Sequence, residues 1–275
     1  MDNKNSFMTW FPLDFFLLTF AFSWIIWLPT VLDAKHLVKL SFNPGLLILA
    51  GLFGPSVSAF IVTGIREGRK GVWLLLKRAV NFRVPFQWIA FIFLFPFLVY
   101  GTSHFILILI GGKVPGEMLW DRKPGYLLIF FLGMLLNGAL NEEFGWRGYA
   151  LDRLQSRYNA LVSSLILGII WSIWHLPMFF SYATGHIYIS FWVFMAFVCS
   201  FAIIFTFIYN STGGNLFAAI LLHTTGNFFI SQFNLIQRGG DQRAFLVATV
   251  LQIVAAAVIV KIWGPAQLKS ASARE

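Results

Sequence analysis

The feature that most constrains this chain is a series of long apolar runs separated by short polar segments. A transmembrane helix needs about 20 consecutive, mostly apolar residues. Runs of this kind predict eight spans, at residues 14–32, 44–65, 87–111, 125–147, 160–181, 189–210, 214–235 and 244–263. Only 11% of the residues are charged, whereas a soluble domain carries about 25%. The sequence therefore predicts an all-α, polytopic transmembrane helical bundle with about eight spans.

The residues outside these spans are too few for a soluble domain. We expect one membrane domain: helices one to three in 1–124, a core with the polar motifs in 125–235, and the last span with its tail in 236–275. The N-terminus lacks the basic region and small-residue cleavage site of a signal peptide, so the first span is expected to be retained.

The distribution of lysine and arginine predicts the orientation of the chain. If the N-terminus is cytoplasmic, the inner segments, with Arg147 included, hold 13 of these residues and the outer segments 7. Cytoplasmic loops carry the excess of positive charge, so we expect both termini in the cytoplasm and the chain in the cell membrane. The net charge of +9 comes from these loops, and no basic stripe indicates nucleic acid as a partner.

The first polar motif comes at the end of the fourth run, where an ionisable side chain is costly in a bilayer. Glu143 and Arg147 stand four residues apart, so on a helix they share a face and can pair. Glu142 points about 100° away and has no obvious partner, which makes it a candidate general base. The alternative is that both acids are solvated at the cytoplasmic end of the span.

Two further motifs lie in later runs. Trp171 precedes His175 by four residues in span five, and His223 precedes Asn227 by four in span seven. Taken singly, each has a structural interpretation, as a satisfied core histidine or as a hydrogen bond between helices. The other histidines are assigned no function: His36 and His186 fall in loops and His104 in span three.

The three motifs lie at one depth only if helix four is longer than its apolar run. Residues 148–157 contain no helix breaker after Gly148, which favours a helix continuing to about Arg157 and a turn at Tyr158 and Asn159. An antiparallel hairpin would then bring Glu142 level with His175. We expect the motifs to meet in the inner part of the protein, reachable from the cytoplasm.

These residue types are suited to amide hydrolysis. A glutamate and a histidine facing one water can deprotonate it, while a second histidine and an asparagine donate hydrogen bonds to the oxyanion. This hypothesis requires no cofactor. The alternative is Zn²⁺ held by Glu142, His175 and His223, although no His-Glu-x-x-His run is present.

In their order on successive spans, the three motifs resemble those of the CPBP family of intramembrane proteases, the CAAX prenyl protease and bacteriocin-processing group. The resemblance covers about residues 125–235. It implies that Glu142 and His175 activate water and that His223 and Asn227 form the oxyanion site. It also implies that Glu143 and Arg147 orient the first motif. Trp171 stands where the family usually has phenylalanine.

The sequence thus predicts an intramembrane endopeptidase acting on a membrane-associated peptide or lipidated protein. A glutamate-dependent, metal-free reaction is favoured over the metalloprotease that the family label implies. One alternative is a non-catalytic immunity protein or peptide-binding scaffold. Another is a proton-coupled transporter, since buried glutamate and histidine also form proton relays. The inverted repeats typical of transporters are not detected.

Overall fold

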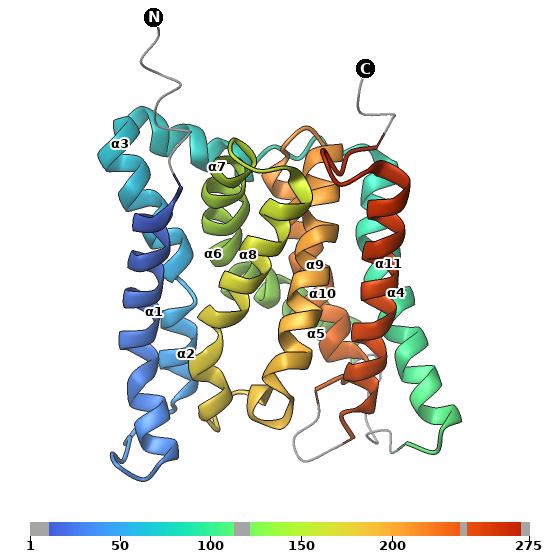
Figure 1. Ribbon diagram of the computed structural model, residues 1–275. Helices are drawn as coiled ribbons and strands as arrows, with labels where there is room; N and C mark the ends of the chain where they lie inside the picture. The colour runs from blue at the N-terminus through green and yellow to red at the C-terminus, as the bar shows by residue number, and fades with distance from the viewer. Residues whose placement is uncertain (1–10, 113–121, 237–240, 271–275) are drawn as a thin grey trace, which may run out of the picture.

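A computed structural model describes residues 11–112, 122–236 and 241–270, and within these ranges the chain forms helices and no strands. The described residues form eight helical rods, one for each predicted span, which pack into the bundle in Figure 1. In chain order they are α1 (Leu13–Ala34), α2 (Gly45–Gly51) with α3 (Gly54–Ala79), α4 (Phe86–Leu109), the fourth rod detailed below, α8 (Ala160–Trp174), α9 (Phe191–Ser211), α10 (Leu216–Gln232) and α11 (Arg243–Trp263). The predicted all-α bundle is confirmed.

Six of the described rods are long and apolar enough to cross a bilayer. The fourth rod and α10 do not meet those limits, and they are the rods that carry the glutamates and His223. The outer surface of the bundle is apolar: Ile25, Ile129 and Trp192 are all at least 70% exposed. Contact of such side chains with water is unfavourable and contact with lipid is not, so the chain is an integral, multi-pass membrane protein.

The fourth rod is one continuous helix that changes its winding twice. It consists of α5 (Pro124–Met134), the π-helical η3 (Leu135–Ala139), α6 (Leu140–Gly145), the π-helical η4 (Trp146–Leu151) and α7 (Asp152–Gln155). The side chain of Asn159 then accepts a 2.9 Å hydrogen bond from the backbone N–H of Val162 and caps α8. The predicted extension of helix four and the turn near Asn159 are therefore confirmed. The π-helical segments, which are frequent at functional sites, flank both glutamates.

Helix α3 changes direction at Gly68, whose φ of 67° and ψ of −167° break the helix. The first half of α3 packs against α1 and α6. The second half turns away at the end of the bundle where α1 begins and α11 ends (Figure 1). Most of the connection expected at 66–86 is therefore helical, because glycine tolerates the positive φ that the turn requires.

Close packing of α3 on α6 depends on Gly145. The Ser56 hydroxyl donates to the backbone carbonyl of Asn141 at this contact. A Cβ atom on residue 145 would lie 2.6 Å from Cβ of Pro55 and 2.7 Å from its carbonyl oxygen. The facing backbone cannot move aside easily, so only glycine fits here.

We expect Gly145→Ala to destabilise the protein by about 1–3 kcal/mol, the usual cost of overpacking a core. The measurement is the melting temperature of the purified protein in detergent. Gly125→Ala, where a Cβ would meet no atom within 4 Å, is the matched control. Equal melting temperatures for the two variants would contradict this packing argument.

Candidate active site

A cavity of about 310 Å³ lies among the fourth rod, α8, α9 and α10 and is lined by Glu142, Trp171, His175, His223 and Asn227. The structure thus brings the three sequence motifs together on one cavity. The remaining lining is largely apolar, and its apolar side, as we call it, is the part that α9 and α11 contribute: Phe194, Phe197, Val198, Phe201 and Phe245. We call this space the reaction cavity. Its volume and mixed lining are those of a small-molecule or peptide site.

Glu142 is buried, and two indole groups hold its carboxylate. Trp171 Nε1 donates to Oε2 of Glu142 at 2.7 Å, and Trp146 Nε1 donates to the same oxygen at 3.2 Å. A buried carboxylate without hydrogen bonds would be strongly disfavoured. The two indoles therefore stabilise Glu142 and fix its orientation at the cavity wall.

Glu143 is fully buried and does not line the reaction cavity. Its Oε1 accepts from Arg147 Nη1 at 2.8 Å and contacts His223 Nδ1 at 2.7 Å. The Arg147 guanidinium also lies over the Phe205 ring, 3.7 Å from its centroid. The predicted pairing of Glu143 with Arg147 is confirmed. Because a carboxylate oxygen accepts, His223 Nδ1 carries a hydrogen toward Glu143, and Nε2 is left as the other ring nitrogen.

The tautomer of His175 follows in the same way from a contact with its own helix. His175 Nδ1 lies 2.8 Å from the carbonyl oxygen of Trp171, one helical turn earlier. A carbonyl oxygen only accepts, so Nδ1 is the donor and the neutral ring keeps the lone pair of Nε2. A histidine oriented by a backbone carbonyl in this way can act as a general base through Nε2.

The zinc alternative requires Glu142, His175 and His223 to converge on one point. Among the described residues, no three histidine, cysteine, aspartate or glutamate side chains lie close enough to hold a metal ion together. His223 Nδ1 is directed to Glu143, so a metal could bind this ring only through Nε2. The three side chains share a cavity without forming a ligand set.

Sequence reasoning missed the role of the two tryptophans. Compared with the phenylalanine that the family usually has at this position, Trp171 keeps an aromatic ring and adds the N–H that donates to Glu142. Trp146 follows Glu142 by four residues, so helical spacing was a signal that could have identified this donor. Both indoles belong to the site because they bind the candidate base directly.

His186 was also missed, because its place in a loop gave no signal. It lies in the short 3₁₀ helix η6 (Gly185–Tyr188) and lines the reaction cavity. Its ring stacks on that of His175, with centroids 5.6 Å apart and planes at 27°. Burial lowers the pKa of His186 to about 4, so the ring is neutral at pH 7. His104, by contrast, is buried with Nδ1 3.1 Å from the carbonyl oxygen of Phe233, in agreement with a structural role.

The reaction cavity extends toward the end of the bundle opposite the start of α1 and the end of α11. Its lining reaches Thr184 and His186 between α8 and α9, Ile236 after α10 and Phe245 at the start of α11. If the termini are cytoplasmic, this part of the cavity wall lies toward the outer end of the bundle, whereas the sequence predicted a site reached from the cytoplasm. Arg147 was counted among the 13 lysines and arginines of the inner segments. It no longer belongs there, because it is buried beside Glu143 and does not lie in a loop. The remaining bias of 12 to 7 still favours the prediction that the termini are inside.

A labelling experiment can decide the orientation. In a Cys199→Ala background, we expect a membrane-impermeant maleimide to label Tyr182→Cys, which is at the cavity end and exposed, in intact cells. Lys70→Cys, exposed at the opposite end, should react only after the membrane is opened, because the positively charged end stays inside. The reverse pattern would show that the site faces the cytoplasm and that the predicted orientation is wrong.

Comparison with known proteins places the site in a family context. Residues 124–229 match the family described as type II CAAX prenyl endopeptidase Rce1-like. The matched segment contains every motif residue that lines the reaction cavity. The chain is also 29% identical over 262 residues to CAAX prenyl protease 2 of Methanococcus maripaludis, covering 90% of this chain and 93% of the relative. The likeness to this relative therefore extends beyond the site to most of the bundle.

Proposed function

We propose that this chain is a member of the family of Rce1-like type II CAAX prenyl endopeptidases, whose model it matches over residues 124–229, and that it hydrolyses a peptide bond in a membrane-associated or lipidated protein. The observation that carries the proposal is the single cavity lined by Glu142, His175, His223 and Asn227. These are the residue types that water activation and oxyanion stabilisation require.

In the proposed reaction, a water held between Glu142 and Nε2 of His175 attacks the carbonyl carbon of the scissile bond. The water loses a proton to the carboxylate as the new carbon–oxygen bond forms. The oxyanion accepts a hydrogen bond from Asn227 Nδ2. It accepts a second one from His223 Nε2 when the His223 ring carries a proton on both nitrogens. The carbon–nitrogen bond then breaks, and Glu142 returns the proton to the departing amine. No covalent intermediate with the protein is formed.

The apolar side of the reaction cavity suits an apolar substituent near the scissile bond. Phe194, Phe197 and Phe201 of α9 present rings there, and burying a lipid chain or large apolar side chain against them is favourable. A prenyl group is one such substituent, as the name of the relative from Methanococcus maripaludis indicates. We therefore propose a lipidated or strongly apolar peptide segment as the substrate class.

The test uses purified protein reconstituted in vesicles with an S-farnesyl-cysteinyl peptide and with an unmodified apolar peptide. We expect mass spectrometry to detect hydrolysis of the farnesylated peptide. A parallel sample treated with a strong zinc chelator should retain its activity, because no three-ligand metal set is formed by the described residues. Loss of hydrolysis on chelation, with recovery when Zn²⁺ is added back, would support the zinc alternative. Binding of both peptides without hydrolysis would favour a scaffold.

A further inference from the structure

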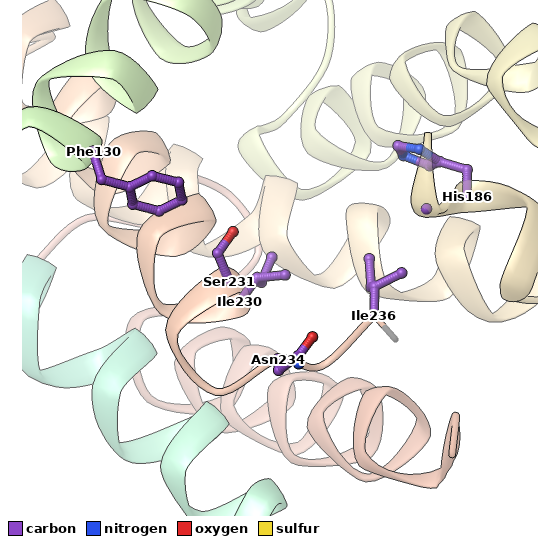
Figure 2. Close-up of a pocket in the computed structure, with 7 residues that line it drawn as sticks. Phe130, His186, Ile230, Ser231, Asn234 and Ile236 are labelled. Atoms are coloured by element: carbon purple, nitrogen blue, oxygen red, sulfur yellow. The ribbon is translucent and has the colours of Figure 1, made fainter. Parts of the chain in front are cut away.

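A second cavity, which we call the vestibule, adjoins the reaction cavity at the same end of the bundle. It has a volume of about 400 Å³ and is lined by Phe130, Gly185, His186, Ile230, Ser231, Asn234 and Ile236. Figure 2 shows Phe130 and His186 on opposite sides, with Ser231, Asn234 and Ile236 between them. The sequence motifs include none of these residues.

The vestibule and the reaction cavity share part of their walls. His186, Ile230 and Ile236 line both spaces. Since the His186 ring stacks on His175, it marks the boundary between the vestibule and the proposed water-activating group. A chain that extends from the scissile bond into the vestibule therefore passes beside His186.

The lining of the vestibule is polar without being charged. Ser231 contributes a hydroxyl, Asn234 an amide and His186 an imidazole that is neutral at pH 7. Each of these groups can both donate and accept hydrogen bonds. Carboxylate, ammonium and guanidinium groups are missing from these seven lining residues. Such a surface suits a polypeptide backbone, which presents alternating donors and acceptors and no net charge.

The environment of His186 supports a role in binding. Its ring contacts the rings of Phe179 and Phe194, at centroid distances of 5.3 Å and 5.1 Å. Its Nδ1 is buried and has no hydrogen-bond partner within the described part of the chain. An unsatisfied buried nitrogen costs about 1–3 kcal/mol. Aromatic contacts therefore hold the ring, and no described residue bonds its Nδ1.

The loop that carries His186 is fixed close to the end of α10. A Cβ on Gly185 would lie 2.9 Å from Cγ2 of Ile236, so glycine permits this approach. The contact sets His186 facing the segment that contains Ser231 and Asn234 (Figure 2). The three polar groups come from two segments of the chain and converge on one space.

We propose that the vestibule is a peptide-binding subsite in which His186, Ser231 and Asn234 bind the backbone of the substrate segment that extends away from the scissile bond. This inference rests on the proposed peptidase function. A cavity of about 300–1,000 Å³ accommodates a drug-sized ligand, so a short extended peptide fits. The apolar side of the reaction cavity would receive the lipid or apolar side chain, and the vestibule the polar main chain.

The kinetic test compares two S-farnesyl-cysteinyl peptides with the same scissile bond, one long enough to enter the vestibule and one too short. His186→Phe keeps an aromatic ring over His175 and removes both ring nitrogens. For the long peptide we expect KM to rise roughly five- to tenfold, the equivalent of about one hydrogen bond, with kcat little changed. The short peptide should be unaffected, and His186→Gln should recover part of the loss. Tyr182→Phe, an exposed change in the same loop, is the matched control.

Wild-type KM values for His186→Phe with both peptides would overturn the subsite. An equal fall in kcat for both peptides would also overturn it, since His186 would then act only by positioning His175.

A second measurement does not depend on hydrolysis. In a Cys199→Ala, Glu142→Gln background, Ser231→Cys should react with a maleimide more slowly when the long peptide is present and at the usual rate with the short one. Equal rates would contradict the subsite. Protection without any hydrolysis by the wild type would retain the subsite and refute the proposed function.

Discussion

Replacing Glu142 by glutamine is expected to abolish peptide hydrolysis and leave the fold intact. Glutamine has the shape of glutamate, and its carbonyl oxygen can still accept from the indoles of Trp146 and Trp171. It cannot take up the proton of the attacking water. General acid–base catalysis contributes about 10²–10⁴-fold, so we expect a fall of at least that order in kcat. The measurement is the rate of product formation in vesicles at saturating substrate.

The control for this prediction is Glu67→Gln. Glu67 is a partly exposed glutamate that pairs with Arg153 at 2.7 Å and does not line the reaction cavity. Its variant should keep wild-type hydrolysis. If Glu142→Gln hydrolyses the peptide at the rate of Glu67→Gln, Glu142 is not the base. A third outcome is that Glu142→Gln loses hydrolysis but still replaces the wild-type protein in cells that lack it. The cellular role then comes from binding, as the immunity or scaffold hypothesis predicts.

Replacing Glu143 by alanine is expected to cause the largest loss of stability. The variant leaves the fully buried guanidinium of Arg147 without its charged partner and removes the contact of His223 Nδ1. Removing one member of a buried ion pair costs about 3–5 kcal/mol, because the other charge stays buried and uncompensated. We expect a large fall in melting temperature in detergent and little folded protein in the membrane.

A second variant separates this charge effect from a simple loss of packing. Removing both charges, in Glu143→Leu combined with Arg147→Met, should recover much of the stability, because a buried pair is often replaced by apolar side chains at little cost. The double variant should stay inactive, since His223 has lost the carboxylate that orients it. A melting temperature for Glu143→Ala equal to that of the wild type would refute the structural role assigned to this ion pair.

The two adjacent glutamates have different expected roles: Glu142 in proton transfer and Glu143 in holding a buried ion pair. Helical geometry alone separated them, because residues four apart share a face and adjacent residues do not. The structure adds His223 as a second partner of Glu143 and two indole donors to Glu142. Glu143 thus links Arg147 on its own helix to His223 on α10, and Glu142 is left to face the reaction cavity.

Local patterns predicted the motif residues that meet at the site, but not all of the residues around them. Glu142, His175 and His223 stood out because polar groups in apolar runs are costly. His186 gave no such signal, since a histidine in a loop costs nothing until tertiary packing places it over His175. The motif depths also gave no indication that the cavity wall extends toward the end of the bundle away from the termini, because they gave the level of the residues and not the direction of the cavity.

The sequence by itself determined the membrane environment of this protein, the number of helical rods in the described part of the chain and the motif residues that line the reaction cavity. It could do so because apolar length and helical spacing are local properties. Only the tertiary structure decided that Trp171 donates to Glu142, that His223 contacts Glu143, and toward which end of the bundle the cavity extends. These depend on how separate helices pack and how loops return across them, and contacts between residues distant in sequence leave no periodic trace in the chain.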